Sequence, residues 1–210
     1  VYKRQNSYRR EYNEKYSGLN DICFVNEEDG WLVGDSGLIF ITHNGGNSWI
    51  EYDSNITNDL IQVQFTSEQI GWLLDNDGFL YKSNDGGITW EILTSPFFKN
   101  INDFYFINES IGWVITNSPY PTLLKTQDGG NQWTIQLSFP SYTSSEKFKD
   151  IYFLNVTHGW VLIQGANNFT PYNLIFYTRN SGITWEDFSI SNNLQKIFFI
   201  NPFLGLSLIH

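Results

Sequence analysis

The chain has 210 residues, with 12 Lys plus Arg against 22 Asp plus Glu and a formal net charge of -10. This sign excludes the usual basis of nucleic-acid binding, which is neutralisation of phosphates by basic side chains. Aromatic residues make up 18% and charged residues only 16% of the chain, so we expect many buried rings. No apolar run approaches the roughly 20 residues that cross a bilayer, and we therefore expect no membrane-spanning segment.

Four consecutive units share one order of predicted elements: residues 19–59, 60–100, 101–147 and 148–193. Each unit opens with a strand of alternating polarity, at 22–25, 63–66, 104–107 and 151–154. A second strand begins at a Gly-Trp pair, whose tryptophans are Trp31, Trp72, Trp113 and Trp160. A third strand covers 38–42, 79–83, 123–126 and 174–178, and a fourth begins at Trp49, Trp90, Trp133 and Trp185. Four strands in a period of about 40 to 50 residues predict a β-propeller blade.

A polar turn motif precedes the second tryptophan of every unit. It has a Ser or Thr, then an Asp or Asn two residues later, then glycine; the Asp or Asn positions are Asn44, Asp85, Asp128 and Asn180. A side-chain oxygen there can accept backbone N–H bonds, and glycine allows positive φ. We therefore interpret these four residues as structural rather than as metal ligands or catalytic acids. We expect no metal and no cofactor, and we expect all eight tryptophans to be mostly buried.

These motifs resemble the Asp-box, or BNR, repeat, and the added Gly-Trp pairs are most similar to propellers of the photosystem II stability and assembly factor type. The resemblance covers about residues 19–210 and implies an all-β propeller. It also implies an arginine-rich partner surface, which this chain lacks, so a photosynthetic role is not supported. Asp boxes occur in sialidases and sortilin-like receptors as well, because one fold hosts many functions.

The two ends of the chain resemble parts of blades within one propeller domain, 1–210. Tyr8 precedes Phe24 by 16 residues, as Trp49 precedes Phe65, so residues 1–18 are expected to be strand four of a preceding blade. Residues 194–210 begin a further blade, with Gly205-Leu206 in place of a Gly-Trp pair. Two readings remain: a closed five-bladed ring, or an incomplete ring excerpted from a larger one. The absence of an initiating methionine and of a final turn motif favours the incomplete ring.

Two sets of residues are candidate binding sites. Segments 116–122, 138–147 and 165–173 are longer than their counterparts, and we expect them on one face, where they carry the aromatic residues Tyr120, Tyr142, Phe169 and Tyr172. Such loops suit a protein or glycan ligand, although loops also tolerate neutral insertions. The second set precedes each first strand and should ring the channel mouth: Asp21, Gln62, Asp103, Asp150 and Lys196. Asp103 and Asp150 would favour a basic group, unless these side chains only bond to backbone.

The sequence favours a non-catalytic scaffold over an enzyme. A sialidase-like glycosidase, the first alternative, needs three converging arginines, but the chain has only Arg4, Arg9, Arg10 and Arg179, of which three crowd one terminal segment. A carbohydrate-binding or sortilin-like receptor is the second alternative. We expect a propeller that binds a protein or a glycan and is exported to the periplasm, the cell surface or the medium.

Overall fold

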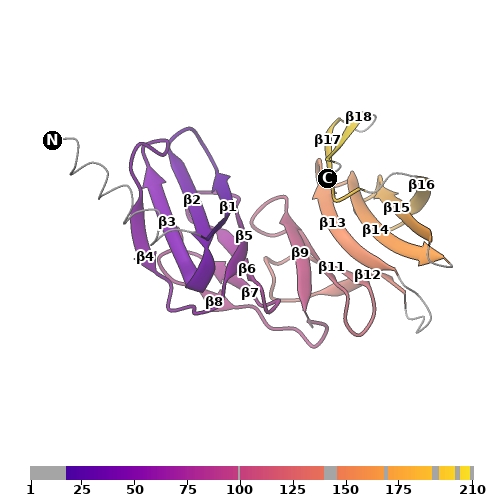
Figure 1. Ribbon diagram of the computed structural model, residues 1–210, viewed down its shortest axis with the longest axis horizontal. Helices are drawn as coiled ribbons and strands as arrows, with labels where there is room; N and C mark the ends of the chain where they lie inside the picture. The colour runs from indigo at the N-terminus through magenta and orange to yellow at the C-terminus, as the bar shows by residue number, and fades with distance from the viewer. Residues whose placement is uncertain are drawn as a thin grey trace.

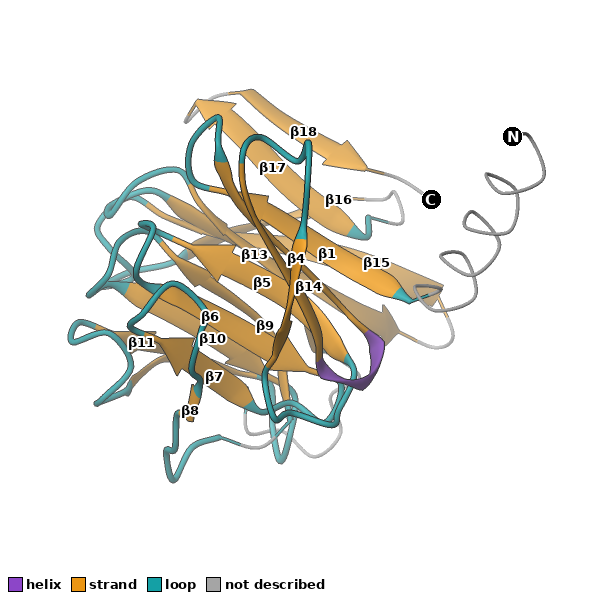
Figure 2. Cartoon of the chain, turned by 90° about the vertical axis from the view of Figure 1, so that its left-hand side faces the viewer, coloured by secondary structure: helices purple, strands orange, loops and turns teal. Residues whose placement is uncertain are grey.

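In the computed structural model, the structure describes residues 18–98, 100–139, 146–167, 170–190, 194–201 and 204–208. These residues form strands and turns, with one short 3-10 turn at Asp35–Gly37 (Figure 2). The strands make four antiparallel sheets of four strands and one sheet of two strands, and neighbours in a sheet are neighbours in the chain. Each complete sheet is therefore a meander, as the repeat predicts.

The strand bounds define the blades. Blade 1 contains β1 (Leu19–Phe24), β2 (Asp29–Gly34), β3 (Leu38–His43) and β4 (Ile50–Asp53), and blade 2 contains β5 (Leu60–Phe65), β6 (Gly71–Asp75), β7 (Leu80–Ser83) and β8 (Glu91–Ile92). Blade 3 contains β9 (Ile101–Phe106), β10 (Gly112–Thr116), β11 (Thr122–Thr126) and β12 (Thr134–Ser138), and blade 4 contains β13 (Lys147–Phe153), β14 (Gly159–Asn167), β15 (Thr170–Thr178) and β16 (Glu186–Ile190). The part-blade contains β17 (Lys196–Asn201) and β18 (Leu204–Leu208).

The blades follow one another along an arc, with blade 1 and the part-blade on opposite sides (Figure 1). The first strands contact one another in sequence: β1 with β5, β5 with β9, β9 with β13, and β13 with β17. The all-β propeller architecture is thus confirmed, and the described residues form four complete blades and part of a fifth. Our assignment of residues 1–18 to a preceding blade concerns a segment of which the structure describes only Gly18.

Each Gly-Trp tryptophan joins its blade to the next one. Its indole stacks on a phenylalanine of the following first strand, with nearly parallel rings whose centroids are 3.4 to 3.9 Å apart: Trp31 on Phe65, Trp72 on Phe106, Trp113 on Phe153 and Trp160 on Phe199. These four tryptophans are at most 4% exposed. The equivalent Phe24 of blade 1 has no such stacking partner in the described part of the chain and is 41% exposed. The stacked pairs therefore form the main apolar seams between blades.

A second contact crosses each of the first three seams, at a backbone carbonyl in the next turn motif. In blade 1 the donor is Trp31 Nε1, 2.8 Å from Gly86 O. In blades 2 and 3 a lysine donates instead, with Lys82 Nζ 3.1 Å from Gly129 O and Lys125 Nζ 2.8 Å from Ser181 O. These ammonium groups also lie over the Trp72 and Trp113 rings, at 5.7 and 5.4 Å. The buried Nε1 atoms of Trp72 and Trp113, unlike that of Trp31, have no hydrogen-bond partner.

The four turn motifs have the same hydrogen-bond pattern. In blade 3, Asp128 Oδ1 accepts bonds from Thr126 Oγ1 and Gln132 N, both at 2.9 Å. The side chains of Asn44, Asp85 and Asn180 accept the equivalent pair of bonds in the other blades. The glycines that follow have positive φ, which side chains with a Cβ rarely adopt. In this arrangement the Asp or Asn residue holds the turn between strands three and four.

Replacing Asp128 by alanine should lower the free energy of unfolding by about 1 to 2 kcal/mol, because the turn loses the acceptor of one part-buried and one exposed hydrogen bond. Asp128→Asn is the matched control, since blades 1 and 4 use asparagine at this position. Chemical denaturation would measure both variants. Equal stability of the alanine variant and the parent protein would show that Asp128 does not hold this turn.

The second tryptophan series is also mostly buried, as predicted, but less completely than the first. Trp133 is 7% exposed, whereas Trp49, Trp90 and Trp185 are half-buried. Each of them lies one residue before the outermost strand of its blade, and not at its first residue as expected from the sequence. Segment 165–173 also differs from expectation: β14 and β15 are simply longer there, and remain paired from Gly165 with Tyr172 to Asn167 with Thr170. A longer hairpin lets the added residues pair their backbone groups.

Candidate functional site

The first strands carry a row of residues that face the next blade at the centre of the arc. We call Asp21, Gln62, Asp103, Asp150 and Lys196 the channel row. Asp21 Oδ2 accepts a bond from Val63 N at 2.8 Å, Asp103 Oδ2 from Ile151 N at 3.1 Å, and Asp150 Oδ2 from Ile197 N at 2.6 Å. Gln62 Nε2 donates to Phe104 O at 3.1 Å. The first four members therefore tie each blade to the first strand of the following blade.

Asp103 of β9 and Asp150 of β13 are neighbouring carboxyl groups, which we call the carboxyl pair. Burial, and next the charge of Asp150, raise the pKa of Asp103 well above its ordinary value of 3.8. Burial also raises the pKa of Asp150, although the bond from Ile197 N favours its charged form. Two neighbouring carboxylates cannot both ionise cheaply. We therefore expect the pair to retain one proton near neutral pH.

A row of rings lies two residues further along three of these strands. We call Tyr105, Tyr152 and Phe198 the aromatic row. The ring centroids are 5.5 Å apart for Tyr105 and Tyr152, and 5.0 Å apart for Tyr152 and Phe198. Burial is the first cause that raises the pKa of Tyr105 to about 12 and also raises that of Tyr152, so both side chains are neutral phenols. Phe198 is 48% exposed.

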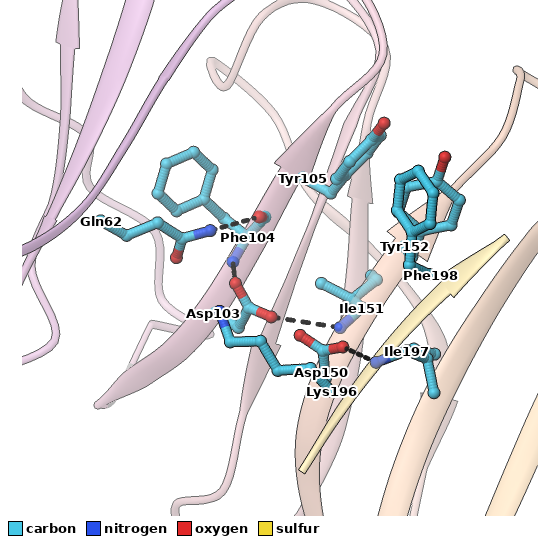
Figure 3. Close-up of a pocket in the computed structure, with 10 residues that line it drawn as sticks. All are labelled: Gln62, Asp103, Phe104, Tyr105, Asp150, Ile151, Tyr152, Lys196, Ile197 and Phe198. Atoms are coloured by element: carbon cyan, nitrogen blue, oxygen red, sulfur yellow. Dashed lines mark hydrogen bonds between the residues drawn. The ribbon is translucent and has the colours of Figure 1, made fainter. Parts of the chain in front are cut away.

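Four residues of the channel row (all except Asp21) and the aromatic row line one pocket of about 580 Å³, which we call the central pocket (Figure 3). Its walls come from β9, β13 and β17, with Gln62 of β5 at one side. Lys196 contributes the cation of the pocket and is exposed. Burial raises the pKa values of Asp150 and Asp21, and the charge of Lys196 opposes this rise. The pocket thus combines aromatic ring faces, two carboxyl groups and one long basic side chain. This arrangement is suited to binding polar or cationic side chains.

The candidate loop residues lie near the start of β13, as far as the structure describes them. Asn117 holds segment 116–122 against β13 through both backbone groups of Phe148, at 2.8 and 2.9 Å. Tyr172 donates its hydroxyl hydrogen bond to Glu146, at the end of segment 138–147. Tyr120 is half-buried within its segment. Tyr142 and Phe169 lie outside the described residues, so their part in a binding face stays a prediction.

The aromatic row was not predicted from the sequence, although the signal was present. Residues two apart on a strand point to the same side, so Tyr105 and Tyr152 must face the channel if Asp103 and Asp150 do. The prediction included only the residues of the channel row. The same rule places Cys23 of blade 1 and Gln64 of blade 2 at positions equivalent to the aromatic row. Gln64 bonds both backbone groups of Phe106 at 2.8 Å.

No three His, Cys, Asp or Glu side chains come together as a metal site among the residues that the structure describes. The same part of the chain contains no helix of the length and apolar character needed to span a membrane.

The repeated four-stranded blades, the stacked Gly-Trp seams and the four identical turn motifs define the class as an Asp-box β-propeller. The sequence profile of the photosynthesis system II assembly factor YCF48 matches residues 4–94 and 89–196. The chain therefore belongs to the YCF48 family. No curated protein sequence matches it.

Three solved structures are similar to this fold. One, described as YCF48 bound to D1 peptide, has a TM-score of 0.51 and 16% identity, over 90% of this chain and 89% of the other. YCF48 from Cyanidioschyzon merolae has a TM-score of 0.50 and 17% identity, over 90% and 92%. The GH74 enzyme of Niastella koreensis has a TM-score of 0.52 and 13% identity, over 87% of this chain and 42% of the enzyme. At these identities the likeness concerns the fold alone.

Proposed function

We propose that this chain is a non-catalytic propeller scaffold that binds a segment of a protein partner at the central pocket and the adjoining loops. The observation that carries the proposal is the composition of the pocket: accessible ring faces beside carboxyl groups that are already held by backbone N–H donors. Aromatic side chains at the mouth of a rigid scaffold give a large contact area at low entropic cost. This arrangement favours binding over chemistry.

The hydrogen bonds of the carboxyl groups support a non-catalytic role. A glycosidase needs one carboxyl group that protonates the leaving group and a second that acts as nucleophile or base. Asp103 and Asp150 instead accept hydrogen bonds from Ile151 N and Ile197 N of the following blade, at 3.1 and 2.6 Å. Arg179, the arginine that the described residues include, lies in a turn motif and stacks on Tyr177 at 5.1 Å.

Peptide is the ligand class that the family relationship favours. A fold relative is described as bound to a D1 peptide, and the family is one of assembly factors. In our proposal the partner crosses blades 3 and 4, where it contacts Tyr120, Tyr142, Phe169 and Tyr172 and reaches Asp103 and Asp150. The proposal concerns peptide binding and carries no photosynthetic role.

Binding to an array of defined 15-residue peptides, together with a glycan array, tests this function. We expect the protein to bind a subset of the peptides, and Tyr120→Ala combined with Tyr172→Ala to weaken that binding about ten-fold or more, as loss of two aromatic contacts would. Ile183→Ala is the matched control, because Ile183 is 79% exposed on a turn motif. Binding to glycans alone would replace peptide by carbohydrate as the ligand class.

A hydrolysis assay with xyloglucan and with a fluorogenic sialoside tests the non-catalytic part separately. We expect no turnover above that of the buffer. Turnover that Asp103→Asn abolishes would overturn the scaffold proposal in favour of a glycosidase.

A further inference from the structure

We propose that a lysine or arginine side chain of the partner enters the central pocket and displaces a proton from the carboxyl groups of Asp103 and Asp150. This inference rests on the proposed function, since it names the side chain that the partner places in the pocket. It makes partner binding dependent on pH, with one proton released to solvent for each cation bound.

The aromatic row provides the walls that such a side chain needs. The planes of Tyr105 and Tyr152 are inclined by 63°, and those of Tyr152 and Phe198 by 55°, so the three faces do not form one flat platform. The rings lie together on one side of the two carboxyl groups (Figure 3). Cations bind over such ring faces, and the aliphatic stem of lysine or arginine packs against them. A volume of about 580 Å³ accommodates a side chain of this length.

The carboxyl pair lies beside these rings and is fixed in place. Asp103 accepts bonds from Phe104 N and Ile151 N, at 2.8 and 3.1 Å, and Asp150 accepts one from Ile197 N. These bonds fix the orientation of both carboxyl groups, so the two groups remain neighbours in the pocket. Either a proton or another cation must therefore offset the second negative charge.

Apart from Lys196, the groups on neighbouring strands that face Asp103 and Asp150 carry no positive charge, so they do not offset the charge of the two carboxyl groups. Gln62 of β5 offers a neutral amide, and Tyr105 and Tyr152 are neutral phenols. Across the channel Asp21 adds negative charge near Lys196. Lys196 itself is close enough to influence Asp150 but forms no ion pair with it at contact distance. It is therefore a competitor of the incoming cation, and its exposed stem allows it to move aside.

The charge of the molecule favours the same ligand. With a net charge of -10, the protein attracts basic segments and repels acidic ones before contact. An acidic side chain in the pocket would meet Asp150, whereas a basic side chain gains from both the local and the overall field.

Titration with the peptide acetyl-Gly-Lys-Gly-amide, followed by NMR signals of the pocket tyrosines, tests the inference. The control peptide carries norleucine in place of lysine, which keeps the stem and removes the charge. We expect the affinity for the lysine peptide to increase as the pH rises from about 6 to about 8, by up to ten-fold per pH unit if one proton is released on binding. We expect the norleucine peptide to bind weakly and with no dependence on pH.

Three variants make the result specific to the pocket. Asp103→Asn, which holds no titrating proton, should remove the pH dependence of lysine-peptide binding. Lys196→Gln should tighten binding several-fold because it removes the internal competitor. Arg179→Gln makes the same charge change on a turn motif and should leave the affinity unchanged.

Equal binding of the two peptides, or pH dependence that persists in Asp103→Asn, would overturn the inference. If array peptides bind through Tyr120 and Tyr172 but need no basic residue, the inference fails and the scaffold function stands. If neither arrays nor basic peptides bind, the scaffold function fails as well.

Discussion

Trp72→Ala is expected to lower the free energy of unfolding by about 3 to 5 kcal/mol, the usual cost of removing a large buried ring. Trp72 is fully buried and stacks on Phe106 at 3.7 Å, with 8° between the ring planes. Its loss would open a cavity in the seam between blades 2 and 3 and remove the ring beneath the Lys82 ammonium group. Thermal and chemical denaturation would measure the effect.

Trp49→Ala is the control for this prediction, because Trp49 is half-buried on an outer strand and makes only an edge contact with Phe24, at 5.9 Å. We expect a loss of about 1 to 2 kcal/mol there. Losses of equal size at both positions would contradict the view that the seams between blades, rather than burial of tryptophan in general, dominate stability.

A finer comparison uses phenylalanine. Trp31→Phe removes the hydrogen bond to Gly86 O, while Trp72→Phe removes a buried Nε1 that has no partner. Since an unsatisfied buried donor is costly, we expect Trp31→Phe to be the more destabilising of the two, although both leave a ring on which the next phenylalanine can stack.

The repeat made the blades predictable, because Gly-Trp pairs and turn motifs recur in register and each fixes one strand boundary. The stacking partner of each tryptophan was not predictable in the same way. Trp113 meets Phe153, 40 residues further along the chain, and that pairing depends on how one blade is rotated against the next. Alternation within a strand tells which residues share a side, but not which side faces a neighbouring blade.

The candidate site, like the blades, was predictable from the sequence only in part. The sequence placed Asp103 and Asp150 near a common axis, and the rule of alternation would have added Tyr105 and Tyr152. The raised pKa values could not be inferred, because they depend on burial and on the proximity of carboxyl groups from two strands. The alternative that these side chains bond to backbone agrees with the structure, in which Asp103 and Asp150 each accept a bond from the next blade.

Asp103→Asn should change how stability depends on pH. The pKa of Asp103 is raised in the folded protein, first by burial and then by Asp150, so the folded state binds more protons than the unfolded state as the pH rises above 3.8, the ordinary value. In that range the free energy of unfolding of the parent protein falls with increasing pH. Asparagine cannot ionise but can still donate a hydrogen bond to Asp150, so the variant should gain stability relative to the parent, by about 1 kcal/mol or more at alkaline pH.

Asp128→Asn should change the pH dependence of stability in the opposite direction. Burial works against the charged form of Asp128, but bonds from Gln132 N and Thr126 Oγ1 outweigh it and lower its pKa, so its contribution to stability is present at neutral pH and is lost in acid. Denaturant titrations of both variants at several pH values should therefore diverge, with Asp103→Asn improving relative to the parent as pH rises and Asp128→Asn not improving. Parallel curves would mean that Asp103 and Asp150 are both ionised in the folded protein, and that Lys196 or solvent, rather than a shared proton, balances their charge.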